Sequence, residues 1–573
     1  MVVRLRQLRV ARGGAGGVGG LVRQAQARGC GPGVLATIYG KIKKTVKHTL
    51  IFGVGSVVKS AFGVLLIPVY TRYLKASEFG VLSLLTITLT LVTIVLTFGL
   101  NHAFFRHYYE TEDAAHRRRI VGSTLIFLLI SSSLVTALLC MVAPQVSAAV
   151  FSGDGGRAEF ANRADLLRLV FLISFFETIT IVPDSILRAN FKSVRYSALS
   201  ITSFAFQLFL ISYLVIAVDK SVNSVLIGRL AGVIFEAVLV FIMVRRELSL
   251  SFSASELRNM LAFGAPLIFG QISFTLFMMI DRFFLERYAS PRELGVYAIS
   301  NTLVSVITVL ATVPFSQVWT VMRFSVMNEE GAEEYYSRVL TYILFVSMFL
   351  ALGVAAVVGD GLLRFARQDY WGAAQIIPLL ALSAVLDSAS RVLNIGITLN
   401  KRTIFAPIVI IIALAINIVL NFLLIPRYGS LGATVSTLMS YAVFCALRYW
   451  ASNLFFKVRY EWGRVFTIGA AGVALIAAFY VIDYLRGYVD DSYSYDDPAR
   501  RRALYFSASL KLLMALSFPA ILFGLGFFHD GELRRLGVMW QKLSYALRRR
   551  RPEENPQLKA DDLRMNADKG IGD

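Results

Sequence analysis

The chain has 573 residues, of which 56% are hydrophobic and 17% charged, and its mean hydropathy is +0.63. Soluble domains are usually about 45–50% apolar and about 25% charged. The apolar excess is gathered into runs of about 20 residues, the length that crosses a bilayer. The composition therefore excludes an ordinary soluble domain and indicates a polytopic membrane protein.

The formal net charge is +21, which in a soluble protein would suggest a nucleic-acid partner. Here, 20 of the 58 Lys and Arg residues lie in the two ends of the chain, 1–48 and 529–573. Basic ends are typical of the cytoplasmic segments of membrane proteins. We therefore expect both termini in the cytoplasm and no nucleic-acid binding.

Motifs for metals, nucleotides and disulfides are missing from the sequence. The three cysteines (Cys30, Cys140 and Cys445) are far apart, and the five histidines show no metal-ligand spacing. No phosphate-binding loop of the form G-x-x-x-x-G-K-[ST] occurs. We expect no metal, no cofactor, no catalysis and no direct use of a nucleotide.

In chain order, a Gly/Arg-rich segment precedes a long series of apolar runs, and a second basic segment follows them. The runs cover about 50–70, 80–101, 121–143, 167–187, 196–217, 223–244, 260–280, 295–319, 339–358, 373–396, 404–425, 431–451, 465–483 and 505–528. They predict an all-α fold of about 14 transmembrane helices. The predicted division is a basic cytoplasmic tail (1–48), an N-terminal six-helix lobe (49–250), a C-terminal six-helix lobe (251–455), two extra helices (456–530) and a basic cytoplasmic tail (531–573).

Two short motifs recur in order. An Arg-Tyr pair followed four residues later by Glu-[Phe/Leu]-Gly-Val occurs at 72–81 and again at 287–296, an offset of 215. Asp-Ser-x-x-Arg occurs at 184–188 and at 387–391, an offset of 203. Two matches in corresponding helices indicate a tandem repeat of six-helix units around a pseudo-two-fold axis along the membrane normal. We interpret the first motif as hairpin scaffold, and place the chemistry in a cleft between the two copies.

Polar stripes in the apolar runs provide the candidate site residues, because intramembrane charges usually face the protein interior or a water-filled cavity. Six residues are substrate-binding candidates: Lys59, Arg229, Arg188, Arg391, Asn101 and Asn417. Four acidic residues are candidates for ion coupling: Asp184, Asp387, Glu177 and Glu236. Helical spacing places Glu177, Asp184 and Arg188 on one face.

Each candidate also has a structural interpretation. The two Asp-Ser-x-x-Arg motifs place opposite charges four residues apart, where they can neutralise each other within one helix. The Ser/Thr stripe of the second run (Ser83 to Asn101) and the Asn417/Asn421 pair suit helix packing. Lys59 has no acidic neighbour within a turn, so it is the best anion-binding candidate. It could instead snorkel or pair with Glu177 or Glu236, and Glu236 could hold Arg229.

Three stretches of the sequence carry a family resemblance: GVLLIPVYTRYLKASEFGVLSLL (63–85), TFGLNHAFFRHYYE (97–110) and FGAPLIFGQISFTLFMMIDRFFLERYASPRELGVYAIS (263–300). They resemble the oligosaccharide-lipid flippases of the polysaccharide transporter branch of the MOP superfamily. The resemblance covers about 48–455 and implies two six-helix lobes with alternating access. Its implied substrate is an undecaprenyl-diphosphate-linked oligosaccharide for O-antigen, capsule or exopolysaccharide. Membrane lipids, and the glycosyltransferases and polymerase of the same pathway, are the implied partners.

Four other functions stay open. A multidrug or cation antiporter of the same superfamily would need an acidic cleft, against which Lys59 argues. A peptidoglycan-precursor flippase would share the fold. A polysaccharide polymerase or ligase would need a large outside loop, and the predicted outside loops are short. A scaffold without transport would leave the charges inside the apolar runs unexplained.

Overall fold

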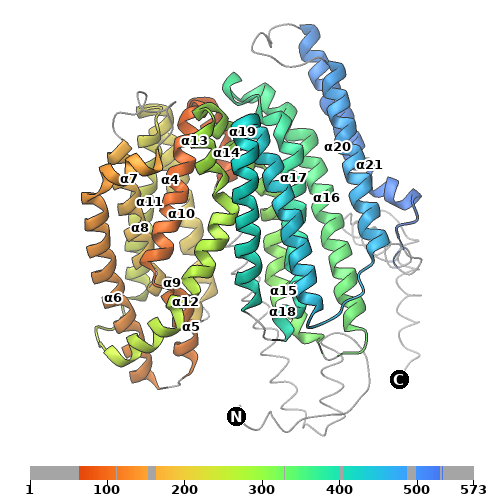
Figure 1. Cartoon of the computed structure of the whole chain (residues 1–573). Helices are drawn as coiled ribbons and strands as arrows, with labels where there is room; N and C mark the ends of the chain where they lie inside the picture. Colours follow the sequence, from red (N-terminus) through yellow and green to blue (C-terminus); the bar gives the residue numbers. More distant parts are fainter. Residues whose placement is uncertain are drawn as a thin grey trace, which may run out of the picture. The chain divides into compact units, whose positions relative to one another are not determined.

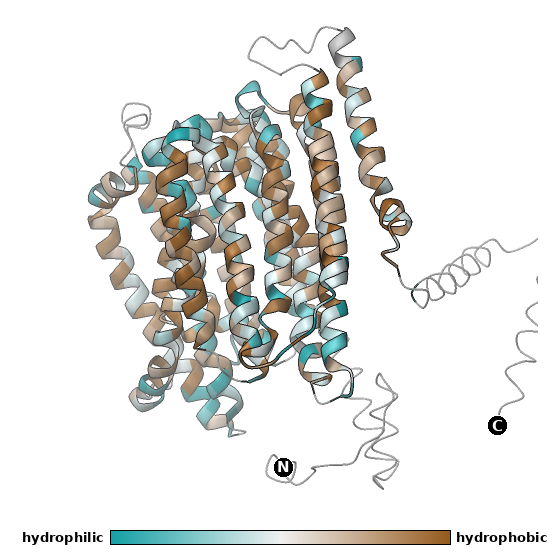
Figure 2. Cartoon of the chain, turned by 45° about the vertical axis from the view of Figure 1, so that its right-hand side comes forward, coloured by the Kyte–Doolittle hydropathy of each residue, from teal (hydrophilic) through white to brown (hydrophobic). Residues whose placement is uncertain are grey.

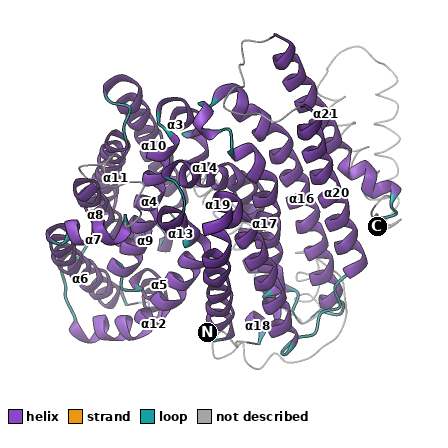
Figure 3. Cartoon of the chain, turned by 45° about the horizontal axis from the view of Figure 1, so that its top comes forward, coloured by secondary structure: helices purple, strands orange, loops and turns teal. Residues whose placement is uncertain are grey.

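A computed structural model describes residues 63–110, 113–151, 163–190, 192–327, 329–400, 404–486, 498–528 and 532. Over these residues the chain is made of helices joined by turns, and no strand is present (Figure 3). The predicted tail 1–48, nearly all of the predicted tail 531–573 and the candidate Lys59 lie outside this part of the chain. By contacts the chain divides into two units, Met1–Leu516 and Ser517–Asp573. The lobes described below belong to the first unit.

The helices follow the predicted order (Figure 1). The first lobe contains α3 (Ile67–Tyr73), α4 (Ala76–Leu96), α5 (Leu100–Glu110), α6 (Ala114–Met141), α7 (Ala143–Val150), α8 (Arg163–Ile179), α9 (Ile181–Ala189), α10 (Ser193–Tyr213), the π-helical turn η3 (Leu214–Val218) and α11 (Val222–Val244). The second lobe contains α12 (Ala254–Met279), α13 (Asp281–Tyr288), α14 (Pro291–Ile307), the π-helical turn η4 (Thr308–Thr312), α15 (Val313–Ser325), α16 (Ala332–Phe365), the 3₁₀ turn η5 (Gln368–Tyr370), α17 (Ala373–Leu393), α18 (Ile395–Leu399) and α19 (Phe405–Asn453). The helices α20 (Trp462–Arg486) and α21 (Pro498–Gly524) follow.

Twelve helices in the described part of the chain are long and apolar enough to cross a membrane. Hydrophobic residues predominate along the middle of many of these helices, and hydrophilic residues are more frequent toward their ends (Figure 2). The prediction of an all-α polytopic membrane fold is confirmed. One of the twelve, α19, contains both predicted runs 404–425 and 431–451, which are separated by a break at Gly429 (φ 53°, ψ −129°). Since most of the run 50–70 lies outside the described residues, the count of 14 stays a prediction.

The run predicted at 167–187 is two helices rather than one. α8 ends at Ile179, and α9 begins at Ile181. Pro183 explains the break, because its ring lacks an N–H and crowds the carbonyl group four residues earlier. The face expected to carry Glu177, Asp184 and Arg188 is therefore interrupted between its first and second members.

The two copies of the Glu-x-Gly-Val motif contact each other where α4 packs against α14. A side-chain carbon at Gly295 would lie 1.7 Å from the backbone oxygen of Ala76, and one at Gly80 would lie 2.9 Å from that of Pro291. The repeat offset of 215 relates Gly80 to Gly295 and Ala76 to Pro291, so the two contacts are equivalent under the repeat. Only glycine allows the two backbones to approach this closely. The repeated motif is thus the surface through which the lobes touch.

A second contact fastens the same ends of the lobes. The Tyr370 hydroxyl donates to the backbone oxygens of Leu74 (3.3 Å) and Lys75 (3.1 Å), and the Arg367 amide donates to Thr71 O (3.1 Å). The Tyr370 side chain is fully buried. Burial raises the pKa of its phenol well above the usual range, and the nearby carboxylate of Glu78 acts in the same direction. The phenol therefore keeps its proton. These hydrogen bonds of Tyr370, which we call the latch, should not weaken between about pH 6 and pH 9.

The helix α12 belongs to the cores of both lobes. Its residues Leu257 and Met260 lie in the first-lobe core, whereas Phe277 packs with Tyr441 and Phe444 in the second-lobe core. Between these halves, Gly264 lies against the backbone of Gly99, in the turn before α5. Pro266 interrupts the hydrogen bonds of the helix. Any change in the angle between the lobes must therefore be absorbed in the middle of α12.

The glycine contact predicts a position-specific loss of stability. We expect Gly295→Ala to lower the free energy of unfolding by about 1–3 kcal/mol, because its new carbon meets a backbone that cannot move aside. The matched control is Gly353→Ala on α16, where a side-chain carbon meets no atom within 4 Å. The control should stay within about 1 kcal/mol of the wild type, toward higher stability. SDS titration of both purified variants measures the difference, and equal values would refute the role given to Gly295.

The latch predicts a change in the distance between the lobes. Tyr370→Phe keeps the ring but removes a donor worth about 1 kcal/mol, so the population with separated lobes should rise about fivefold. Double electron–electron resonance measures this population with spin labels attached at Lys75→Cys and Gln368→Cys, which are both exposed positions. An unchanged distance distribution in the Phe variant would mean that the hydroxyl does not hold the lobes together.

Candidate transport site

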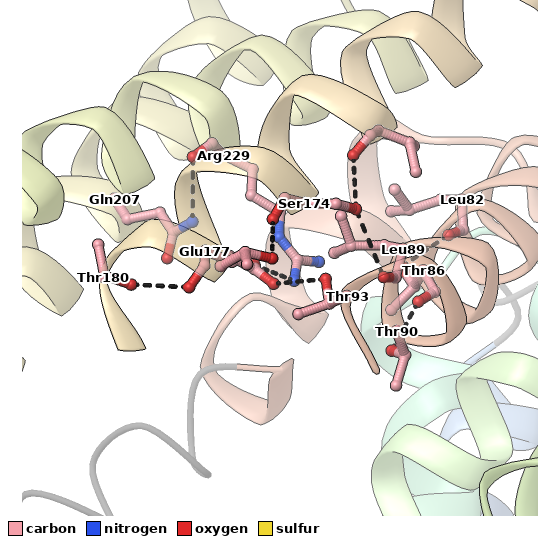
Figure 4. Close-up of polar contacts among 12 residues, drawn as sticks. Leu82, Thr86, Leu89, Thr90, Thr93, Ser174, Glu177, Thr180, Gln207 and Arg229 are labelled. Carbon is pink, nitrogen blue, oxygen red and sulfur yellow. Dashed lines mark hydrogen bonds and ion pairs between the residues drawn. The ribbon is translucent and has the colours of Figure 1, made fainter. Parts of the chain in front are cut away.

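A charged cluster in the first lobe joins four helices, α4, α8, α10 and α11. The Arg229 Nη2 of α11 donates to the Glu177 carboxylate of α8 at 3.0 Å. The Thr93 hydroxyl of α4 approaches the other carboxylate oxygen at 3.5 Å, and the Gln207 amide approaches the backbone oxygen of Arg229 at the same distance (Figure 4). Both charged side chains are partly buried, 28% and 29% exposed. The structure thus brings two of the predicted candidates into one ion pair.

Hydroxyl groups of the Ser/Thr stripe of α4 donate mostly to backbone oxygens of the same helix. Thr86 donates to Leu82 O at 2.8 Å, and Thr90 donates to Thr86 O at 2.9 Å (Figure 4). Thr93 is the member that reaches the carboxylate of another helix. Asn101 lies half-buried at the start of α5, and its side-chain oxygen accepts the amide of the next residue at 3.0 Å.

The three other first-lobe candidates are not members of this ion pair. Asp184 and Arg188 lie on α9, beyond the break. The Arg188 side chain is exposed, and its guanidinium carbon lies 5.3 Å from the ring centre of Phe105 and 5.8 Å from that of Tyr196. Cation–π contacts of this kind stabilise an arginine against an aromatic face. Glu236 is half-buried on α11, seven residues after Arg229.

A second cluster surrounds Asp281 in the second lobe. Asp281 is 2% exposed. Its carboxylate accepts hydrogen bonds from the Tyr297 hydroxyl (2.5 Å), the Thr437 hydroxyl (2.8 Å) and the Asn421 amide (2.7 Å). Asn417, a predicted candidate, accepts from Asn421 at 3.0 Å and donates to Ser440 at 3.1 Å. The cluster joins α13, α14 and both halves of α19.

Asp281 is missing from the predicted site residues. The sequence places it in a charged turn, because the apolar run ends at 280. In the structure α13 continues to Tyr288, which leaves Asp281 deep in the lobe. The Asn417/Asn421 pair in an otherwise apolar run was the available signal, since two amides one turn apart can bind a charge on a neighbouring helix.

The chemistry of this cluster suits a small hard cation or a proton. A buried carboxylate is stable only when it is paired or hydrogen-bonded. The Asn421 side-chain oxygen is buried and has no hydrogen-bond partner among the described residues. This oxygen, the Asp281 carboxylate, Asn417 and Thr437 form a set of oxygen ligands, the type that alkali and alkaline-earth cations prefer. In the described part of the chain, no group of three or more His, Cys, Asp or Glu suits a metal.

A third cluster lies on α17 and α19. Arg391 donates to the Asp387 carboxylate at 3.0 Å, as the four-residue spacing predicts. Arg448, which was not predicted, donates to the backbone oxygen of Ser390 at 2.9 Å and to its hydroxyl at 3.1 Å. Arg448 therefore brings a second guanidinium group to the turn of α17 that holds the Asp387–Arg391 pair.

Comparison with known proteins identifies the family. Residues 69–371, more than half of the chain, match the family described as "Polysaccharide biosynthesis protein". The chain belongs to this family. An uncharacterized membrane protein of Methanocaldococcus jannaschii is 23% identical over 424 residues, which cover 69% of this chain and 82% of that protein. The polysaccharide-transporter resemblance inferred from the sequence is thereby confirmed.

Solved structures share the fold. The lipid II flippase MurJ in an inward closed conformation has a TM-score of 0.66 at 15% identity, covering 83% of this chain and 99% of its own. An inward-facing multidrug resistance MATE transporter of the MOP superfamily has a TM-score of 0.59 at 14% identity, covering 69% and 94%. At these identities the likeness shows that the chain shares the fold of these structures.

The ion pair of the first lobe can be tested by a double-mutant cycle. Arg229→Gln leaves Glu177 without its cation. We therefore expect Arg229→Gln to lower the free energy of unfolding more in the wild type than in the Glu177→Gln variant. The interaction energy should be about 1–2 kcal/mol. The exposed pair Arg106–Glu110, with 55% of each side chain exposed, is the control and should give under about 1 kcal/mol. SDS titration of the variants measures both, and equal coupling in the two pairs would contradict the account.

Proposed function

We propose that the protein is a flippase that moves an undecaprenyl-diphosphate-linked oligosaccharide across the cytoplasmic membrane by alternating access. The product would serve O-antigen, capsule or exopolysaccharide synthesis. One observation carries the proposal: the segment that matches the polysaccharide biosynthesis family, 69–371, contains the contact between the lobes, the Glu177–Arg229 pair and Asp281. The family supports a polysaccharide pathway, and the two-lobed fold supports transport.

The diphosphate of such a substrate cannot cross hydrocarbon without compensation of its charge. Arg229 is a candidate for this role once Glu177 releases it, and Lys59 is a candidate outside the described residues. Hydroxyl and amide groups such as those of Thr93 and Asn101 suit the hydroxyl groups of sugars. The polyprenyl chain would stay in the lipid while the head group passes between the lobes.

Asp281 is the residue we propose for ion coupling, in addition to Glu177, Asp184, Asp387 and Glu236. Binding of a proton or an alkali cation would neutralise its buried charge and weaken its bond to Tyr297. Tyr297 lies on α14, two residues after Gly295, and the Glu293 carboxylate of the same turn accepts the Ser430 amide at 2.7 Å. A change at Asp281 would therefore reach the contact between the lobes through one short helical segment.

In this proposal the protein is an integral protein of the bacterial cytoplasmic membrane, and both basic ends lie in the cytoplasm. Its partners are membrane lipids, the lipid-linked substrate, and the glycosyltransferases and polymerase that make and use that substrate. The second candidate is a peptidoglycan-precursor flippase, which is favoured by the TM-score of 0.66 with MurJ. The lipid that accumulates when the gene is deleted separates the two candidates.

Deletion of the gene should cause a lipid-linked oligosaccharide to accumulate on the cytoplasmic side and remove the surface polysaccharide. Asp281→Asn, at wild-type abundance, should restore less than a tenth of the polysaccharide, because the amide cannot bind a proton or cation in the same way. Glu334→Gln, at an exposed position, is the control and should restore all of it. Mass spectrometry of extracted lipids identifies the substrate. Accumulation of a peptidoglycan precursor would favour the second candidate, and unchanged lipids would refute both.

A further inference from the structure

The repeated Asp-Ser-x-x-Arg motif has different surroundings in the two lobes. In the first lobe, the Arg188 guanidinium lies over the rings of Phe105 and Tyr196. In the second lobe, Arg391 pairs with Asp387 and is joined by a further cation, Arg448. The same motif thus ends in an aromatic contact in one lobe and in a cluster with two arginines in the other.

Arg448 is held in place by contacts that do not use its whole guanidinium group. Its Nη1 donates to Ser390, and its guanidinium carbon lies 4.1 Å from the ring centre of Phe444. It interacts electrostatically with both Asp387 and Arg391. Ser390 is the residue before Arg391 on α17, so Arg448 of α19 contacts the turn of α17 that carries Arg391.

The cluster has donors that nothing in the described chain uses. The Nε atoms of Arg391 and Arg448 are both inaccessible to solvent and have no hydrogen-bond partner among the described residues. Buried donors normally have partners, because an unmet one loses its bond to water without replacement. Two guanidinium groups against one carboxylate also leave a surplus positive charge. Both deficits would be corrected by a group with several acceptor oxygens and a negative charge.

We propose that Arg391 and Arg448 form a phosphate-binding site in the second lobe, where the diphosphate of the transported lipid docks. Arginine forks bind phosphate oxygens with two parallel hydrogen bonds. The Arg391 side chain is 34% exposed, so part of the cluster can be reached from outside the lobe. The site lies near the end of α17, which is the cytoplasmic end of the lobe in the orientation predicted from the basic tails.

This inference rests on the proposed function for its ligand, and it adds a location distinct from Arg229 in the first lobe. The lipid would meet the second-lobe arginines at the head-group level of the inner leaflet, before its sugar enters the region between the lobes. Phosphate groups of ordinary anionic lipids share this chemistry, so the experiment separates the two sources.

Binding of inorganic pyrophosphate tests the site directly. The full-length protein in phosphatidylcholine nanodiscs is titrated with pyrophosphate, and binding is followed by thermophoresis. We expect Arg391→Gln and Arg448→Gln to raise the Kd about tenfold or more, since each removes a charge-assisted pair of hydrogen bonds. Arg106→Gln, at an exposed first-lobe arginine outside the candidate site, should bind as the wild type does. Arg448→Lys, which keeps the charge and the fold but not the fork, should weaken binding less than Arg448→Gln.

Competition identifies the source of the phosphate. Undecaprenyl diphosphate placed in the nanodisc should abolish pyrophosphate binding to the wild type, whereas phosphatidylglycerol should not. If phosphatidylglycerol competes and undecaprenyl diphosphate does not, the site binds anionic membrane lipid and its assignment to the substrate is overturned. If Arg391→Gln and Arg448→Lys both bind as the wild type does, there is no phosphate site.

The outcome is separable from that of the proposed function. Pyrophosphate binding that depends on both arginines, in a protein whose deletion accumulates no lipid-linked sugar, would retain the site and refute the flippase. Accumulation of the lipid together with unchanged binding in the arginine variants would retain the flippase and refute the site.

Discussion

The close contact between Gly80 and Gly295 is the constraint on which the rest of the structure depends. At this point the backbone of α4 and that of α14 are so close that a single added carbon at Gly295 would lie 1.7 Å from Ala76 O. Because the two glycines are related by the repeat, one contact fixes both lobes at once. It also fixes the helices that carry Thr93 and Tyr297, each of which reaches a carboxylate in its own lobe.

The charged residues inside the lobes form paired or hydrogen-bonded clusters. Glu177 has Arg229, Asp281 has three donors, and Asp387 has Arg391. Lys511 of α21 is likewise buried, and it pairs with Asp360 of α16 (3.1 Å) and Asp483 of α20 (2.6 Å). Removing one member of such a pair leaves a charge without compensation in a medium that solvates it poorly. Binding of an ion or a phosphate can therefore change the balance between two arrangements of the lobes.

The sequence predicts the helices and the repeat well, because apolar runs of membrane length and two recurring motifs are local features. It predicts the Asp387–Arg391 pair for the same reason, since both residues lie on one turn of a helix. It does not predict that Arg229 binds Glu177 rather than Glu236, because that choice depends on how α8 and α11 pack. Asp281 was missed because a charged residue at the end of an apolar run predicts a turn at the membrane surface. Its burial depends on how α13 packs.

The repeated Glu-x-Gly-Val motif shows the same limit. From the sequence it is a hairpin scaffold, and its position between two helices is correct. That the two copies touch each other, and that Tyr370 fastens the adjoining turn, are consequences of how the lobes face one another. No property of either copy alone contains that information.

In the proposed mechanism, the lobes separate at this contact when a lipid-linked oligosaccharide crosses the membrane. The most direct test is a reversible lock: Thr71→Cys and Arg367→Cys in a variant without the native cysteines, at a position where the backbones are 3.1 Å apart. In proteoliposomes, oxidation should stop the flipping of a fluorescent undecaprenyl-diphosphate oligosaccharide, and reduction should restore it, whereas single-cysteine variants should be unaffected. Flipping at an unchanged rate in the fully cross-linked protein would contradict the account.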